Sequence, residues 1–556
     1  MNREFHPGKQ ASASVGDARH YDAVIVGAGF SGMYMTYLLA KAGYRVKGFE
    51  AGADVGGVWY WNRYPGARCD SQSFVYSYMF SKELYRTYPS LFAEQPEILD
   101  YLNFAADKMD VRKSFQFETR VESAVYQEAD NRWTIRLSDG SSVTTTYFIT
   151  AVGSLSAANI PSIKGLDRFA GEVYHTGQWP HEKVDFTGKR VGVIGTGSSG
   201  IQAIPVIARD AAHLTVFMRT PQYTLPARNR KLDPAFLEGL EADFEGLVRT
   251  IRANDVAMVV GTPTRKVADD APEERQRVFE AAWKEGGALK LVFESYTDIA
   301  VDADANRAVA DFVRAKIRET VEDPAKAEML IPNYEILAKR IVLDTNFFET
   351  FNRSNVDLVA LRQTPIVEVF EGGIRTTEAE IDLDVIVFAT GYNALTGPLL
   401  SFDIRGRDGL SLRDKWQGGA RLQSYLGVAN AGFPNMFTLT GPQSPAVHGN
   451  VPTLIEQHAE WVFDCIRHMT STGADTIEPH PEADSEWART CNEVVQRTLF
   501  ADADNWYTGA NIDGKPRATL TYRGGIRAFR KKCDEVAAAG YDGFRITMPE
   551  NRAVGT

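Results

Sequence analysis

Two glycine-rich turns constrain what this chain can fold into. They read VIVGAGFSG and VIGTGSSG, and each follows an apolar run typical of a buried strand and precedes a run typical of a helix. The glycines are Gly27, Gly29 and Gly32 in the first turn and Gly195, Gly197 and Gly200 in the second. Glycine permits a tight turn and lets a pyrophosphate approach the N-terminus of the helix. The sequence therefore predicts an α/β fold with two Rossmann-like dinucleotide-binding domains.

The residue that ends the second strand differs between the two units. The first unit ends this strand at Glu50, in RVKGFE, and the second ends it at Arg219, in HLTVFMR. A carboxylate here accepts hydrogen bonds from ribose hydroxyls and repels a 2′-phosphate, whereas an arginine binds that phosphate with charge-assisted hydrogen bonds. The sequence therefore predicts FAD or NAD at the first site and NADP at the second.

The order of strand and helix patterns predicts domains that are discontinuous in sequence. Two strands end in similar small residues, AVG at 151–153 and ATG at 389–391, which indicates two crossings between the same two domains. Between the two parts of the second domain, apolar residues recur at helical spacing. The expected bounds are 1–155 with 390–556 for the FAD-binding domain, 156–230 with 335–389 for the NADP-binding domain, and 231–334 for a helical insertion.

Composition and charge exclude several classes of function. The chain has 556 residues, a formal net charge of −11 and no apolar run long enough to span a membrane. The acidic balance argues against nucleic acid or an acidic membrane as a partner, and the lack of a CxxC pair argues against a zinc site or a redox dithiol. The first 20 residues lack the apolar core of a signal peptide. We expect a cytoplasmic protein without a metal site and with a flexible tail at residues 1–20.

Two further segments combine glycine with aromatic side chains. GGVWYWNRYPGARCD, at 56–70, follows the first nucleotide unit, and it fits either a cover for a flat ring system or a structural cluster where domains meet. FAGEVYHTGQWP precedes the second nucleotide unit. Its marked positions are Phe169, Gly171, His175, Trp179 and Pro180. From spacing alone, a histidine in such a loop is more often structural than catalytic.

These motifs together resemble those of the type I Baeyer–Villiger monooxygenases. FAGEVYHTGQWP matches the family fingerprint FxGxxxHxxxW followed by Pro or Asp, and it lies between two GxGxxG motifs as in that family. The segments AKRIVLDTNFFETFNR, ATGYNALTG and WYTGAN are also similar. The resemblance runs from about Tyr21 to Phe544 and looks closest to the phenylacetone and steroid monooxygenase branch.

This resemblance implies an enzyme that inserts one oxygen atom next to a ketone carbonyl. It implies bound FAD, NADPH as reductant, and a small-molecule ketone and O2 as substrates. Dioxygen would add to the reduced flavin, and the resulting flavin peroxide would attack the ketone to give an ester or a lactone. Such a peroxide anion needs a fixed cation in a water-poor site.

The resemblance also implies roles for individual residues. By motif, the catalytic residues are Arg340 and the Asp70 that positions it. The cofactor-binding residues of the FAD site are Gly27, Gly29, Ser31, Gly32, Glu50, Gly57, Val58, Trp59, Asp70, Tyr76 and Val121. Those of the NADP site are Gly195, Thr196, Gly197, Ser198, Ser199, Gly200, Gln202, Arg219, Thr220 and Lys339. Arg340 is a cofactor-binding residue in addition to its catalytic role. The substrate residues are Pro445, Ala446, Val447 and the lid residue Trp506.

His175 lies in the fingerprint segment, and His448 follows the substrate residues 445–447. We assign His175 to domain coupling rather than to proton transfer, and His448 fits either a solvent-facing side chain or a substrate contact.

An alternative function is a flavin monooxygenase that oxidises amine nitrogen or sulfide sulfur. A flavin disulfide reductase would need a redox dithiol, which this sequence lacks. A non-catalytic regulator would not need the residues assigned to catalysis. The natural ketone, the selectivity and the oligomeric state stay open.

Overall fold

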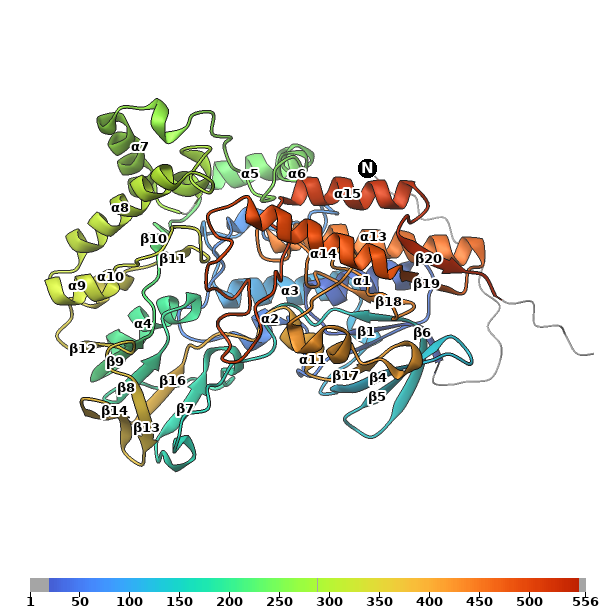
Figure 1. The fold of residues 1–556 in the computed structure, drawn as a ribbon, viewed down its shortest axis with the longest axis horizontal. Coiled ribbons are helices and arrows are strands. Elements are labelled where there is room, and N and C mark those ends of the chain that lie inside the picture. Colours follow the sequence, from blue (N-terminus) through green and yellow to red (C-terminus); the bar gives the residue numbers. More distant parts are fainter. Residues whose placement is uncertain (1–19, 288, 550–556) are drawn as a thin grey trace, which may run out of the picture.

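The computed structural model describes residues 20–287 and 289–549, so the tail predicted at residues 1–20 lies outside the described residues except for its last position. Two largely parallel sheets lie at the lower left and lower right of Figure 1, and a group of helices lies at the upper left. Each sheet contains a strand that leads into a glycine turn and a helix. The predicted α/β class with two Rossmann-like units is confirmed.

The first sheet has β1 (His20–Val26) at its centre, in parallel pairing with β2 (Val46–Phe49) and β6 (Ser142–Thr150). Ala23, Val24 and Ile25 of β1 are 0% exposed, as expected for a strand with neighbours on both sides. The other strands are β3 (Phe115–Gln116), β4 (Val121–Gln127), β5 (Arg132–Leu137), β17 (Asp403–Arg405) and β18 (Met436–Thr438). Their order is β17-β4-β5-β6-β1-β2-β3, with β18 beside β6, so late segments complete the sheet of the first nucleotide unit.

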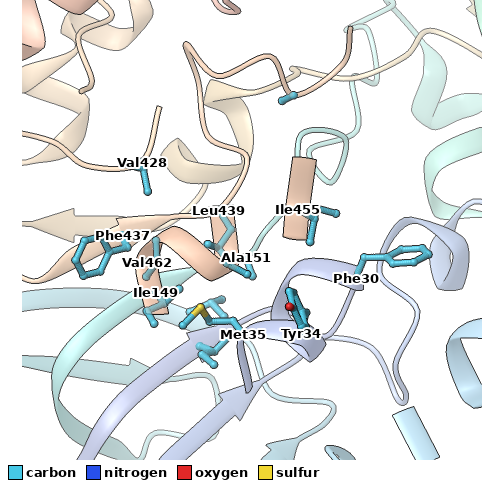
Figure 2. Packing of buried hydrophobic residues seen from close by; sticks show 14 of the residues in the cluster. Phe30, Tyr34, Met35, Ile149, Ala151, Val428, Phe437, Leu439, Ile455 and Val462 are labelled. Carbon is cyan, nitrogen blue, oxygen red and sulfur yellow. The ribbon is translucent and has the colours of Figure 1, made fainter. Parts of the chain in front are cut away.

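Helix α1 (Phe30–Lys41) covers this sheet and packs against α13 (Val451–Thr472). Figure 2 shows Met35 of α1 with Ile149 of β6 and Val462 of α13 in one apolar cluster. The helix of the first nucleotide turn is thereby fixed between the sheet and a helix that lies far away in the sequence.

The aromatic segment at 56–70 contains one helical turn, α2 (Val58–Trp61), which the sequence did not predict. Helix α3 (Gln95–Met109) follows and has Pro96 in its first turn, where proline fits a helix. Glu94 and Glu97 form a reciprocal capping box at its N-terminus.

The second sheet has the order β12-β9-β8-β16-β7, and all of its strands run parallel. Its strands are β7 (Glu172–His175), β8 (Arg190–Ile194), β9 (His213–Met218), β12 (Val356–Ala360) and β16 (Val385–Phe388). Two helices, α4 (Ser198–Asp210) and α10 (Phe347–Thr350), pack together beside it. A separate antiparallel sheet consists of β13 (Ile366–Phe370), β14 (Gly373–Thr376) and β15 (Glu380–Asp382).

The region predicted as a helical insertion is helical in the structure. The insertion follows β10 (Thr224–Pro226) in the sequence. β10 pairs with β11 (Val342–Asp344), which comes after the insertion. Its helices are α5 (Pro234–Ala242), α6 (Phe244–Arg252), α7 (Pro272–Glu285), α8 (Ala303–Thr320) and α9 (Pro324–Leu330). Asp243 separates α5 from α6 and accepts a hydrogen bond from the Gly246 amide, so it caps the second of these helices.

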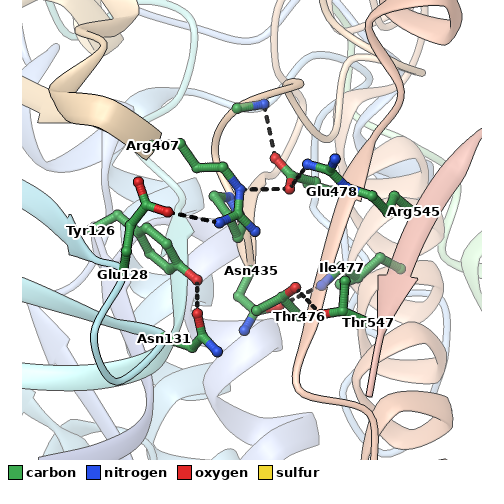
Figure 3. Close-up of polar contacts among 12 residues, drawn as sticks. Tyr126, Glu128, Asn131, Arg407, Asn435, Thr476, Ile477, Glu478, Arg545 and Thr547 are labelled. Atoms are coloured by element: carbon green, nitrogen blue, oxygen red, sulfur yellow. Dashed lines mark hydrogen bonds and ion pairs between the residues drawn. The ribbon is translucent and has the colours of Figure 1, made fainter. Parts of the chain in front are cut away.

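The C-terminal elements lie over the first sheet (Figure 1). They are α11 (Thr396–Leu400), α12 (Leu412–Lys415), β19 (Thr476–Pro479), α14 (Pro481–Gln496), α15 (Ile526–Ala538) and β20 (Phe544–Thr547). Figure 3 shows Arg407 between Glu128 and Glu478, with the Arg407 Nε 2.7 Å from Glu478 Oε1. This ion pair joins the turn after β4 to the pair β19–β20.

None of the helices in the described ranges is long and apolar enough to cross a membrane. The predicted domain bounds stay a prediction, although the sheet composition gives them a physical basis.

Candidate active site

The first glycine turn has no room for larger residues. Gly27 has a φ of +105°, and a Cβ on Gly32 would lie 1.8 Å from the carbonyl oxygen of Gly27. Gly29 precedes α1 without a side-chain cap, so the first N–H groups of this helix stay available to a ligand, with Ser31 beside them. Glu50 is buried and accepts hydrogen bonds from the amides of Ala28 at 2.8 Å and Gly52 at 2.7 Å. The carboxylate is therefore fixed at the edge of the turn.

The other residues predicted for the FAD site lie around this turn. A Cβ on Gly29 would lie 3.3 Å from the Cα of Gly57, which brings the segment after β2 against the turn. Val58 follows on α2 and is 36% exposed. Trp59 is buried and donates from Nε1 to the hydroxyl of Tyr76 at 3.2 Å. Val121 begins β4 and is buried in the same apolar cluster as Trp59 and Tyr76.

The second glycine turn repeats the geometry of the first. Gly195 has a φ of +109°, and a Cβ on Gly200 would lie 2.2 Å from the Gly195 carbonyl oxygen. Gly197 precedes α4 without a side-chain cap, so Ser198 and Ser199 open the helix with free N–H groups. Both predicted nucleotide turns therefore have the shape that a pyrophosphate requires.

Gln202 uses its side chain to join the two nucleotide units. Its Oε1 accepts a hydrogen bond from the Tyr64 hydroxyl at 2.8 Å, and its Nε2 donates to the carbonyl of Arg68 at 3.1 Å. The amide therefore holds the aromatic segment 56–70 against α4.

Three cationic side chains gather where β9 and β12 end. Arg219 follows β9 and is 60% exposed, and Arg362 follows β12 and donates to the Thr220 hydroxyl at 3.3 Å. Burial, together with the charges of Arg219 and Arg362, lowers the pKa of Lys339 to about 8. Thr196 donates to the carbonyl of Thr220 at 3.3 Å and places this cluster beside the second glycine turn. The sequence analysis missed Arg362, although its place after the strand next to β9 was a usable signal.

Arg340 and Asp70 meet although they are far apart in the sequence. The guanidinium Nε donates to Asp70 Oδ2 at 3.0 Å, and Nη2 donates to Asp70 Oδ1 at 2.7 Å. Nη1 donates to the carbonyl oxygen of Val447 at 2.9 Å. The Asp70 charge raises the pKa of Arg340 above its usual range, although burial acts in the opposite direction. The side chain is therefore a permanent cation held from two sides.

The thiol beside this pair is not a nucleophile. Cys69 is buried next to Asp70, and burial, reinforced by the Asp70 charge, raises the pKa of the thiol to about 12. Cys69 therefore stays a neutral thiol at physiological pH.

The predicted substrate residues lie beside the Arg340 pair. Ala446 and Val447 are buried, Pro445 precedes them, and the Val447 carbonyl reaches Arg340. Asn505 directly precedes the segment WYTGAN, and its side chain donates to the Ala338 carbonyl at 2.7 Å, which ties this segment to the residues before Arg340. Trp506 is partly buried, and its ring lies 4.3 Å from that of Tyr507.

Two residues extend this site beyond the predicted set. The ring of His448 lies 4.9 Å from that of Tyr507, and its Nε2 lies 2.8 Å from the Thr521 hydroxyl. Burial, with the charges of Arg523 and Arg340, lowers the pKa of His448 well below its usual value, so its imidazole is neutral. The structure thus places His448 at the site and not toward bulk solvent. Tyr507 was missed, although the aromatic WY pair was its signal.

The fingerprint segment forms an edge strand and a turn in the second sheet. β7 pairs with β16, and a Cβ on Gly171 would lie 2.3 Å from the Asp384 carbonyl oxygen and against the Phe169 ring. Trp179, which precedes Pro180, is buried between Tyr174 and Phe186 in the core of this sheet.

His175 makes contacts apart from those of Arg340. Its Nδ1 accepts a hydrogen bond from the Gly177 amide at 3.0 Å, and burial lowers the pKa of the imidazole. Gly177 has no room for a side chain because a Cβ would lie 2.5 Å from the Tyr392 ring. The Tyr392 hydroxyl donates to the side chain of Asn62 at 2.9 Å. This chain of contacts runs from the fingerprint to the first nucleotide unit.

Comparisons with known proteins agree with this arrangement. Residues 21–235 match a family model described as flavin-binding monooxygenase-like. A Baeyer-Villiger monooxygenase of Pseudooceanicola batsensis is 42% identical over 525 residues, which cover 94% of this chain and 95% of that protein.

Solved structures agree over a similar length. A closed crystal structure of cyclohexanone monooxygenase has a TM-score of 0.93 at 42% identity and covers 96% of this chain and 100% of that one. An oxidised steroid monooxygenase bound to NADP has a TM-score of 0.90 at 45% identity and covers 95% of this chain and 100% of that one. The chain therefore belongs to the Baeyer–Villiger monooxygenase family of flavin-binding monooxygenases.

Proposed function

We propose that this protein is a Baeyer–Villiger monooxygenase that uses FAD, NADPH and O2 to insert one oxygen atom next to a ketone carbonyl, giving an ester or a lactone. The observation that carries the proposal is the Arg340 guanidinium, held by Asp70 and by the Val447 carbonyl beside the predicted substrate residues. The reaction balances as a ketone, O2, NADPH and one proton giving an ester or lactone, NADP+ and one water.

The residues of the first turn fit FAD. The uncapped N-terminus of α1 offers N–H groups to a pyrophosphate, and the missing Cβ atoms of Gly27 and Gly29 leave room for it. Each carboxylate oxygen of Glu50 accepts one hydrogen bond from a backbone amide, so each can accept another from a ribose hydroxyl. Bound FAD, reduced by NADPH, supplies the activated oxygen.

The residues of the second turn fit NADP. Arg219 and Lys339 lie close enough, next to Thr220, for the charge of Arg219 to lower the pKa of Lys339, so the two cations repel each other. A 2′-phosphate would relieve this repulsion and satisfy their donors. We assign Thr196, Thr220 and the N-terminus of α4 to the same cofactor.

Arg340 keeps N–H donors free for the reacting oxygen atoms. Three of its five N–H donors are taken by Asp70 and Val447, which leaves one donor on each terminal nitrogen. These two donors can stabilise negative charge as it develops on the reacting oxygen atoms. Asp70 acts as a positioning residue, because it fixes the plane of the guanidinium.

The fingerprint segment serves the coupling of the two nucleotide sites. The contacts from His175 and Gly177 through Tyr392 to Asn62 support this assignment, and none of them reaches Arg340. We therefore keep His175 out of the catalytic group.

One experiment tests the proposal against the oxidation of nitrogen or sulfur. The purified FAD-loaded protein is given NADPH with linear, aryl, cyclic and steroid ketones, and in parallel with a sulfide and a tertiary amine. Products are identified by mass. Ester or lactone from a ketone, with NADPH consumed in equal amount, supports the proposal. Oxidation of the sulfide or amine alone would replace it with the alternative function.

Two properties stay predictions, and one stays open. The domain bounds given above can be tested by limited proteolysis and the cytoplasmic location by fractionation of cells. The open oligomeric state can be measured by light scattering.

A further inference from the structure

A second guanidinium, that of Arg523, lies next to the site. The Arg523 Cζ lies 5.2 Å from the centre of the Phe500 ring and 5.3 Å from that of Tyr507, so the two rings flank it. Within the described ranges, no carboxylate lies within 4.0 Å of Arg523, and no side-chain hydrogen bond of its guanidinium is found. The side chain is partly buried, and burial lowers the pKa of this guanidinium.

The backbone around Arg523 belongs to the predicted substrate site. The Tyr522 amide donates to the Ser444 carbonyl at 3.0 Å, next to the segment 445–447. The Leu520 amide donates to the Tyr507 carbonyl at 3.1 Å. The positive charges of Arg340 and Arg523 both oppose the rise in the pKa of the Tyr507 phenol, and both lower the pKa of His448. Arg523 therefore contacts the ring of Tyr507, the same residue that the charge of Arg340 influences.

The N–H donors of Arg523 are available to an anion. A guanidinium has five N–H donors, and stacking on two rings satisfies none of them. Oxygen insertion into a neutral ketone requires one fixed cation, which Arg340 provides. The NADP site has its own cations, and Arg523 is not among the charges that lower the pKa of Lys339.

We propose that Arg523 binds an anionic group of the substrate, and that the preferred substrates are ketones that carry a carboxylate. A planar guanidinium can pair with a carboxylate through two parallel hydrogen bonds. Arg340 would act at the ketone carbonyl, and Arg523 would hold the distal acid. The carboxylate is unchanged in the reaction, so the product is an ester or lactone that keeps this acid. The inference rests on the proposed function.

The test compares a keto acid with its neutral ester. Oxidation of 5-oxohexanoate and of methyl 5-oxohexanoate is measured with the wild-type protein and with Arg523→Gln. We expect kcat/KM for the keto acid to fall about 10- to 100-fold in the variant, the range of a lost hydrogen bond between charged groups. For the methyl ester we expect a change of less than about threefold, because it carries no anion.

The matched control is Arg527→Gln. Arg527 is 67% exposed at the start of α15 and lies 3.6 Å from Asp255, so its loss should leave both substrates unaffected. Bound FAD and thermal stability are recorded for each variant. An Arg523→Gln protein that loses FAD would be replaced by Arg523→Lys, which keeps the charge and should retain most of the preference for the keto acid.

Binding without turnover gives a second readout. Calorimetry of the oxidised protein with 5-oxohexanoate and no NADPH should show binding that weakens with salt and is lost in Arg523→Gln. An equal loss in both substrates, or weaker NADP+ binding with unchanged keto acid binding, would overturn the inference. If the wild-type protein forms no ester from either ketone, the proposed function fails, and the calorimetry still reports on Arg523 alone.

Discussion

At Arg340, the contacts that fix the side chain also decide which of its N–H groups can act on a substrate. Asp70 takes Nε and one Nη2 donor, and the Val447 carbonyl takes one Nη1 donor. The charge is permanent because the Asp70 carboxylate raises the pKa of the guanidinium. The orientation depends on two segments that approach from different parts of the chain.

Replacing Arg340 should separate the reduction of the flavin from the oxidation of the ketone. In Arg340→Ala, ester formation should fall by at least about 100- to 1000-fold, the cost of losing a preorganised donor. Reduction of bound FAD by NADPH, followed by stopped-flow absorbance, should stay within about threefold of the wild-type rate, because Arg340 holds no part of the second glycine turn. The exposed Arg497→Ala serves as control. Ester formation at the wild-type rate in Arg340→Ala would remove Arg340 from the mechanism.

The charge of Lys339 should make the affinity for a 2′-phosphate depend on pH. Burial and the neighbouring arginines lower the pKa of Lys339 to about 8 in the free protein, so the ammonium loses its proton as the pH rises through that value. The affinity for 2′,5′-ADP should therefore be higher at pH 7 than at pH 9.5. Lys339→Met should bind more weakly and show a smaller change with pH. A titration by fluorescence checks this, with 5′-AMP as the control ligand. Identical pH curves for both proteins would contradict the assignment.

At the scale of elements, the strand–turn–helix unit is the part that tolerates least change. Gly32 and Gly200 occupy equivalent positions, and at each a Cβ would overlap the carbonyl oxygen of the first glycine of the turn. The close approach of the first turn of the helix to the strand end requires glycine there. The two units thus have the same steric limit although their sequences differ.

Gly32→Ala should disrupt the first unit. The new Cβ would lie 1.8 Å from the Gly27 carbonyl oxygen, so the turn must shift, and overpacking of this kind costs at least about 1–3 kcal/mol. We expect a lower midpoint of thermal unfolding and loss of bound FAD on gel filtration. Gly239→Ala in α5 is the control, because nothing lies within 4 Å of its Cβ position and alanine favours a helix by about 0.5–1 kcal/mol. A Gly32→Ala protein that keeps its stability and its flavin would contradict the prediction.

At the scale of the whole molecule, the helices of the 231–334 region are held to the first nucleotide region by a buried acid. Glu456 on α13 is 1% exposed, accepts hydrogen bonds from the Met79 and Phe80 amides, and has Arg252 of α6 at 3.5 Å from its second oxygen. Burial, reinforced by the charge of the nearby Glu460, raises the pKa of Glu456 to about 8. The Glu456 carboxyl group of the folded protein is therefore largely protonated at neutral pH.

This acid should make the stability fall as the pH rises. Between the ordinary carboxyl pKa of about 4.3 and the folded value of about 8, the folded protein binds a proton that the unfolded chain has lost. The free energy of unfolding should therefore decrease with rising pH in this window. Glu456→Gln should reduce that slope, as measured by urea unfolding at pH 6 and pH 8.5, whereas the exposed Glu238→Gln should not. An unchanged dependence of the free energy of unfolding on pH in Glu456→Gln would contradict this prediction.

Local sequence patterns account for the secondary structure around the nucleotide sites. Apolar runs, glycine turns and helical spacing predicted β1, α1, β8, α4 and the helices between 231 and 334. The single turn α2 escaped because four aromatic and apolar residues carry too short a pattern to distinguish helix from loop. The predicted assignments of the site residues remain to be measured.

The sequence by itself determined the two glycine turns, the acidic and basic strand ends and the family, because each is encoded in contiguous residues. Only the tertiary structure decided which side chains meet. It brought Arg362 to Lys339, fixed Arg340 between Asp70 and Val447, and placed Arg523 between Phe500 and Tyr507. Such contacts join segments that are hundreds or tens of residues apart, and their geometry follows from how the packed elements orient each segment, which local propensity does not specify.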